Sequence, residues 1–158
     1  MEQYERQALT ERQYRAMCAM LDRNNFNYEG NEERYMIRLD FEGDHGDIRI
    51  NVHFDADRCL ASVLTLLPVS FGEETMLASV AIAHTNYLLL DGWFIMDPKS
   101  GGICFKITSS YHGTDLEEEN LHRLIGLSYQ MANTHAGVFK RLASGDLTLY
   151  DFLQGKTE

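Results

Sequence analysis

The sequence predicts an α+β domain in which helices cover one face of a five-stranded antiparallel sheet. Three segments carry apolar residues at helical spacing, and several others alternate apolar and polar residues with the period of a strand. Short connections rich in turn residues join the strands as hairpins, which makes the sheet antiparallel. The expected order of elements is therefore α-β-β-β-α-β-β-α, in two layers.

The first helix is expected to begin at Thr10. The spacing Thr10-x-x-Gln13 matches a capping box, in which side chains bond to the free backbone N–H groups of the first turn. Leu9, before this cap, is expected to pack on Tyr14 as a hydrophobic staple. The helix is expected to end near Asn24, and an apolar stripe runs along it: Tyr14, Met17, Cys18 and Leu21.

Three strands are expected next, and their patterns differ. Residues 34–42 and 48–55 alternate apolar with polar side chains, so each presents one face to the core. The connection over residues 43–47 is rich in residues that tolerate positive φ, which predicts a hairpin. Residues 60–69 are apolar on both sides, so this strand is expected to be central, covered on both faces, or exposed to a partner.

A second helix is expected over about residues 73–90. The strands Trp93–Met96 and Ile103–Thr108 follow it and flank a turn that begins with proline, which predicts a second hairpin. The helix is expected to turn one apolar stripe toward the sheet: Met76, Leu77, Val80, Ala83, His84, Tyr87 and Leu88.

The third helix is the longest. It is expected to open at the capping-box spacing Thr114-x-x-Glu117 and to end at Gly145. The apolar stripes of all three helices are expected to cover the same face of the sheet. Residues 147–153 are expected to dock as a short extra element.

One domain is expected, over residues 10–153, with an amino-terminal extension at 1–9 and a tail at 154–158. The chain has two prolines, no Ser/Gly-rich linker and no internal repeat. Nothing in the composition indicates a boundary inside residues 10–153.

Composition excludes several classes of partner. The 158 residues include 14 Lys plus Arg and 24 Asp plus Glu, for a formal charge of −10, which disfavours binding to the phosphates of nucleic acid. No apolar run approaches the roughly 20 residues of a membrane-spanning helix. The first residues show neither a basic leader nor an apolar signal region, so the expected compartment is the cytoplasm.

No metal or cofactor site is expected. The cysteines, Cys18, Cys59 and Cys104, are widely spaced and form no C-x-x-C pair, which indicates reduced thiols. The acidic segment from Asp40 resembles a calcium loop but places His45 where that loop needs glycine, so it is interpreted as a solvated turn.

No sequence motif in the chain supports a catalytic function. The chain lacks the nucleophile, phosphate-binding and zinc-protease signatures, so it is expected not to be an enzyme. His84 and His135 lie on the apolar stripes of their helices, where a structural role is commonest. His53 and Asp55 share the polar face of one strand. A small enzyme or metal-linked protein remains an alternative, and it requires these histidines to converge with carboxylates.

An apolar surface for protein contact is the positive expectation. The strand over residues 60–69 and the segment that begins at Trp93 are apolar on both sides, which exceeds what one helical layer covers. Either loops and the tail cover the excess, or it forms a surface for self-association or peptide binding. The candidate contact residues are Leu64, Leu66, Trp93, Phe94 and Met96.

Two sequence stretches resemble a known family. Asn86-Tyr87-Leu88-Leu89-Leu90-Asp91-Gly92-Trp93-Phe94-Ile95-Met96-Asp97, followed by Gly101-Gly102-Ile103-Cys104-Phe105-Lys106, is similar to the YbjN-like family of bacterial sensory transduction regulators, itself similar to the type III secretion chaperone fold. The resemblance implies a homodimer that acts by protein contact. It transfers no catalytic residue, and it implies a structural role for Asn86, whose amide would tie the helix end to nearby backbone.

These expectations together favour a non-enzymatic protein-binding module, chaperone-like or regulatory, in the bacterial cytosol. Its partners would be a second copy and a protein or peptide client. A structural subunit of a larger assembly is a further alternative.

Overall fold

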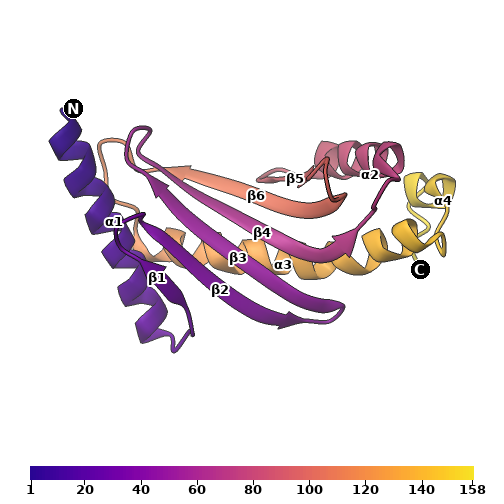
Figure 1. Ribbon diagram of the computed structural model, residues 1–158, viewed down its shortest axis with the longest axis horizontal. Helices are drawn as coiled ribbons and strands as arrows, with labels where there is room; N and C mark the ends of the chain where they lie inside the picture. Colours follow the sequence, from indigo (N-terminus) through magenta and orange to yellow (C-terminus); the bar gives the residue numbers. More distant parts are fainter.

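A six-stranded antiparallel sheet in the order β1-β2-β3-β4-β6-β5 forms the centre of the computed structural model, which describes residues 1–158 (Figure 1). The expected α+β class and antiparallel sheet are confirmed, but the expected number of five strands is wrong. The strands are β1 (Glu29–Asn31), β2 (Met36–Gly43), β3 (Gly46–Asp55), β4 (Leu60–Ser70), β5 (Trp93–Met96) and β6 (Gly102–Ser110).

The additional strand is β1, which lies at one edge of the sheet. It has only three residues, all exposed, and pairs with β2 through Glu29 opposite Arg38. A strand this short shows no alternation of apolar and polar residues, so it leaves no periodic signal in the sequence.

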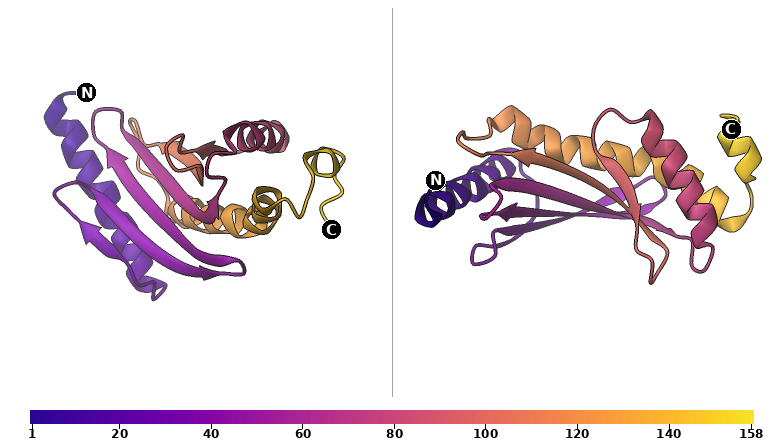
Figure 2. Two further views of the ribbon diagram at one scale, coloured as in Figure 1. Left: turned by 45° about the vertical axis from the view of Figure 1, so that its right-hand side comes forward. Right: turned by 90° about the horizontal axis from the view of Figure 1, so that it is seen from above.

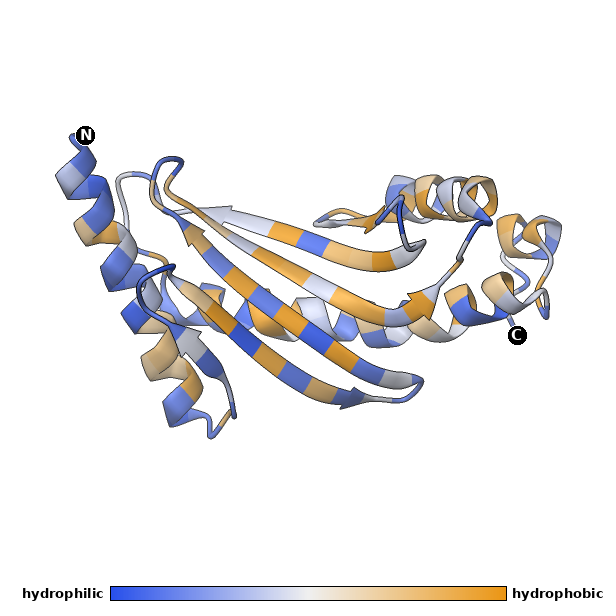
Figure 3. Cartoon of the chain, viewed as in Figure 1, coloured by the Kyte–Doolittle hydropathy of each residue, from blue (hydrophilic) through white to orange (hydrophobic).

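Helices α1 and α3 lie against one face of the sheet, and no helix lies over the other (Figure 2). We call these the inner and outer faces. The core lies on the inner face, where side chains such as Ile50, Val63 and Phe105 are fully buried. The alternation along β2 and β3 separates this core from the outer face (Figure 3). The helices are α1 (Gln3–Arg23), α2 (Thr75–Leu88), α3 (Glu118–Ser144) and α4 (Leu149–Leu153).

The expectation that all three long helices cover one face is wrong for α2. This helix packs beside β5 at the end of the sheet, and it also contacts α3 and α4 (Figure 2). Only Ala78, Ala81 and Thr85 of α2 are buried. Because small residues make this contact, most of the expected apolar stripe of α2 stays outside the core.

Helix α1 begins at Gln3 rather than at the expected Thr10, so it includes residues 3–9. The backbone N–H of Glu2 donates to the carboxylate of Glu5 at 3.0 Å. Thr10 and Gln13 are therefore inside the helix and do not cap it. Their side chains make long-range contacts instead: the Thr10 hydroxyl bonds to the Tyr111 hydroxyl, and the Gln13 carbonyl oxygen accepts from the backbone N–H of Leu116.

The other expected boundaries agree more closely with the structure. The two hairpins, β2–β3 and β5–β6, are present. Helix α3 starts at Glu118 with Glu117 as its N-cap, so the expected capping box at Thr114 is wrong. The expected end is confirmed: the last helical residue is Ser144, and Gly145 follows with a φ of 84°, a left-handed conformation that favours glycine. The segment after Gly145 forms the short helix α4, with Leu147 and Phe152 buried. None of the helices combines the length and the apolarity needed to cross a membrane.

Candidate protein-binding surfaces

An apolar patch occupies the outer face where β4, β6 and β5 lie side by side. Leu66 of β4 pairs with Cys104 of β6, which pairs with Ile95 of β5. Leu64 of β4 likewise pairs with Lys106 of β6, which pairs with Trp93 of β5. Because directly paired residues share a face of the sheet, these side chains all point outward. Leu66 is 37% exposed and Trp93 is 39% exposed. We call the following residues the outer sheet patch: Leu64, Leu66, Trp93, Ile95 and Cys104.

The five predicted contact residues do not all lie on this patch. Phe94 and Met96 alternate with Trp93 and Ile95, so they point to the inner face. Phe94 is only 1% exposed, and its ring packs 5.1 Å from that of Phe105, between centroids. Met96 is half-buried against the core. The structure thus brings Leu64, Leu66 and Trp93 together and separates Phe94 and Met96 from them.

Asn86 joins the end of α2 to β5. Its side-chain Oδ1 accepts a hydrogen bond from the backbone N–H of Phe94 at 2.7 Å, and its Nδ2 donates to the carbonyl of Phe94 at 3.0 Å. The contact holds α2 at the β5 edge of the sheet.

A second apolar surface lies on α2 and was not among the candidate contact residues. Met76 is 77% exposed and Tyr87 is 87% exposed, although both belong to the stripe that was expected to face the sheet. The segment Thr75–Leu88 contains no Asp, Glu, Lys or Arg. We call the following residues the α2 surface: Met76, Val80, Tyr87, Leu88 and Leu90.

The signal for the α2 surface was present in the sequence. A helix without charge on any face is typical of one that is buried all round. The fold buries only one narrow side of α2, through Ala78 and Ala81. Leu77 and Ile82 are half-buried against the core, whereas the residues of the α2 surface stay exposed.

The three histidines considered for catalysis do not form a catalytic cluster. His84 and His135 line one cavity of about 260 Å³ between α2, α3 and α4, and no acidic residue lines it. His53 is exposed on β3. The carboxylate of Asp55 instead accepts hydrogen bonds from the backbone and the guanidinium of Arg58. No group of three His, Cys, Asp or Glu side chains is arranged to hold a metal ion.

His135 has a structural environment. Its ring packs against those of Phe94 and Phe139, with centroids 4.9 and 6.1 Å away. Nδ1 lies 2.9 Å from the carbonyl oxygen of Met131. Burial disfavours the charged imidazolium and lowers the pKa of His135, although the hydrogen bond to Met131 opposes this effect. A neutral ring is thus part of the contact between α3 and β5.

The fold is similar to that of a chain in the crystal structure of the ExsC–ExsE complex. The TM-score is 0.59 at 15% sequence identity, and the match covers 83% of this chain and 96% of that chain. The similarity shows that the two chains share a fold. No protein-family profile and no curated protein sequence matches the chain.

Proposed function

We propose that this chain is a non-enzymatic protein-binding module that acts as a homodimer, chaperone-like or regulatory, in the bacterial cytosol. The α2 surface carries the proposal, because it is an uncharged apolar face that the fold leaves exposed. Exposed apolar patches of this kind mark interfaces with other proteins. The similarity to a chain of the ExsC–ExsE complex also supports protein contact as the function.

The charge distribution of the chain favours a second copy as the partner of the α2 surface. Each copy carries a formal charge of −10, so two copies repel each other through most of their surfaces. Because Thr75–Leu88 carries no charged residue, a contact between two α2 helices places no like charges directly against each other. A twofold contact there is self-complementary, since each copy contributes the same apolar residues.

The outer sheet patch is the proposed surface for a client. Leu64, Leu66 and Trp93 lie on the outer face of the sheet, which no helix covers, so their apolar side chains are available to a partner segment. The acidic balance of the chain favours a client with basic or amphipathic segments. This role agrees with the YbjN-like resemblance, which we retain as part of the proposal.

Light scattering coupled to size-exclusion chromatography tests the homodimer. We expect the wild type to be a dimer and Tyr87→Glu to be a folded monomer, because a carboxylate in an apolar contact must be desolvated. Tyr4→Glu is the matched control, since Tyr4 is 81% exposed on α1, and α1 lies at the opposite end of the sheet from α2 (Figure 1). A wild type that remains monomeric at every concentration, or a Tyr87→Glu variant that remains dimeric, contradicts the proposal.

Affinity purification of the full chain separates a client-binding module from a fixed subunit. A subunit of a larger assembly co-purifies with one partner at constant stoichiometry. A chaperone-like module binds its client through the outer sheet patch, so Leu66→Asp weakens client recovery while the homodimer persists. Recovery of the client at the wild-type level with this variant contradicts the assignment of the patch.

A further inference from the structure

A second cavity of about 260 Å³ opens between α1, β2 and α3, away from both surfaces described above. Three aromatic rings line it, together with Met20, Ile125, Gly126 and His122. The Phe26 ring meets Phe41 edge to face at a centroid distance of 6.0 Å, and Phe41 lies 5.4 Å from Tyr129. The walls are thus built from ring faces, ring edges and aliphatic side chains.

The lining residues offer a ligand few free hydrogen-bonding groups inside the cavity. The Tyr129 hydroxyl already donates to the carbonyl oxygen of Glu42 at 3.0 Å. His122 is exposed, so its ring stays in contact with solvent. Because a guest would lose its hydration without gaining hydrogen bonds, the cavity selects against charged molecules.

Gly126 is the residue whose presence the fold does not otherwise explain. Glycine inside a helix is destabilising relative to alanine, yet a Cβ at Gly126 would meet no atom within 4 Å. Gly137 in the same helix differs, because a Cβ there would lie 2.5 Å from Nε2 of His45. The ring of His45 therefore lies against Gly137, whereas nothing lies against Gly126, where glycine leaves the cavity wall open.

We propose that this cavity binds a single uncharged aromatic ring. Its volume exceeds the roughly 150 Å³ of an apolar cavity that holds benzene and lies just below the roughly 300 Å³ of the smallest drug-sized sites. Aromatic walls favour an aromatic guest, since rings gain from edge-to-face and offset contacts beyond the area they bury. The ring belongs either to a free small molecule or to an aromatic side chain carried by a polypeptide.

Titration with indole, followed by amide chemical shifts, tests the site and does not rest on the proposed function. We expect saturable shifts at the lining residues, a loss of affinity of at least about tenfold in Gly126→Leu, and a change below about threefold in Gly126→Ala. A leucine side chain at this position is expected to occupy part of the cavity, whereas the single methyl group of alanine leaves most of it open. Equal affinity in Gly126→Leu and wild type, or no saturable shift in the wild type, overturns the proposal.

Two further measurements complete the test. A crystal of the wild type grown with 5-bromoindole should show the bromine anomalous signal between Met20, Phe41 and Tyr129, so the proposal stays testable even if Gly126→Leu fails to fold. A bromine signal found only elsewhere overturns it. Titration with N-acetyl-tryptophanamide distinguishes the source of the ring: binding shows that a ring on a polypeptide backbone enters, and binding of indole alone assigns the site to a free molecule.

Discussion

The side chain of Asn86 bonds to both backbone groups of Phe94, accepting from its N–H at 2.7 Å and donating to its carbonyl at 3.0 Å. A carboxamide carries one acceptor and donors in the same arrangement as a peptide group. Asn86 therefore takes the place of a neighbouring strand at the free edge of β5. Satisfying these groups protects the edge from pairing with another chain, and it fixes the position of α2.

We expect Asn86→Ala to lower the free energy of unfolding by about 1–3 kcal/mol, because the backbone groups of the buried Phe94 lose both partners. Urea denaturation measures the change. Asn120→Ala is the matched control, since Asn120 is exposed on α3 and is expected to change stability by less than about 0.5 kcal/mol. Equal effects of the two substitutions would show that the Asn86 contact adds nothing.

Adjacent residues of β5 should respond differently to truncation. We expect Phe94→Ala to cost about 3–5 kcal/mol, because its ring fills the core between Phe105 and Phe139. Trp93→Ala should cost less, since its side chain lies on the outer face and is 39% exposed. Thermal and urea unfolding of both variants provide the comparison, and a larger loss for Trp93→Ala would reverse the assignment of inner and outer faces.

The buried ring of His135 predicts a loss of stability in acid. Its folded-state pKa is lowered from the ordinary 6.5, so the unfolded chain binds this proton more readily than the folded chain. The contribution of the neutral ring is fully present above about pH 6.5 and is lost as the pH falls toward and through the lowered pKa. No acidic side chain lines the cavity beside His135, so the aromatic rings of Phe94 and Phe139 leave the charged form without a counter-ion.

Unfolding free energies of the wild type and His135→Gln, measured between pH 4 and pH 8, check this dependence. We expect the variant to be less stable than the wild type at pH 8 and to lose less stability on acidification. His112→Gln, at an exposed position, is the control and should keep the wild-type profile. A His135→Gln profile parallel to that of the wild type would exclude His135 as the source of the acid sensitivity.

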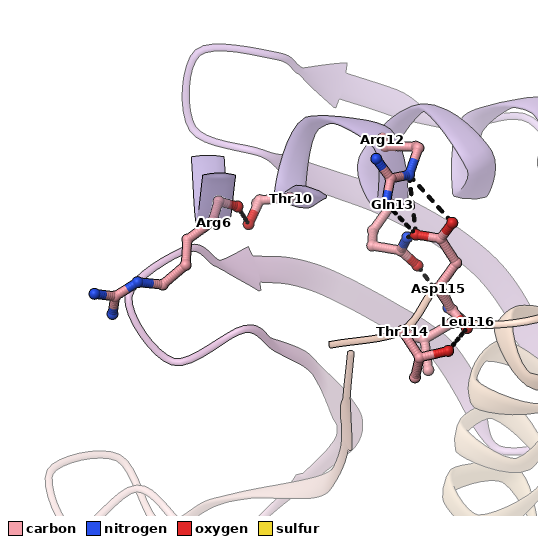
Figure 4. A network of polar contacts seen from close by, with 7 residues as sticks. All are labelled: Arg6, Thr10, Arg12, Gln13, Thr114, Asp115 and Leu116. Atoms are coloured by element: carbon pink, nitrogen blue, oxygen red, sulfur yellow. Dashed lines mark hydrogen bonds and ion pairs between the residues drawn. The ribbon is translucent and has the colours of Figure 1, made fainter. Parts of the chain in front are cut away.

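Gln13 and Arg12 provide a comparison between a buried and an exposed contact to the same loop (Figure 4). The Gln13 side chain is 1% exposed and accepts a hydrogen bond from the backbone N–H of Leu116 at 2.8 Å. The Arg12 guanidinium pairs with Asp115 at 2.9 Å on the surface. The two side chains together connect α1 to the segment that precedes α3.

We expect Gln13→Ala to cost about 1–3 kcal/mol, because it leaves a buried backbone N–H without a partner. Arg12→Ala should cost no more than about 1 kcal/mol, since exposed ion pairs are weak. Urea denaturation in low and high salt distinguishes the effects of the two substitutions on the free energy of unfolding. Salt should reduce the effect of Arg12→Ala and leave that of Gln13→Ala unchanged, and the opposite pattern would assign the main link to the ion pair.

Local periodicity in the sequence was sufficient for the class of fold, and turn residues and Gly145 were sufficient for both hairpins and the end of α3. It also placed Trp93 and Phe94 in one strand. It could not show which of the two faces the core, because alternation defines two faces without saying which one a helix covers. Strand β1 left no signal, since three exposed residues contain no period. Thr10 and Gln13 matched a capping pattern, but contacts from Tyr111 and Leu116 engage them in mid-helix.

Helix α2 shows most clearly the difference between what a local sequence pattern determines and what the tertiary structure decides. Its sequence determined an uncharged helix with an apolar stripe, and the stripe alone predicted burial against the sheet. The tertiary structure placed the helix at the β5 edge, where Ala78 and Ala81 make the contact and Tyr87 stays exposed. A local pattern records which side chains share a face of an element. Whether that face is covered depends on contacts between segments far apart in the chain, and here those contacts leave the α2 surface exposed.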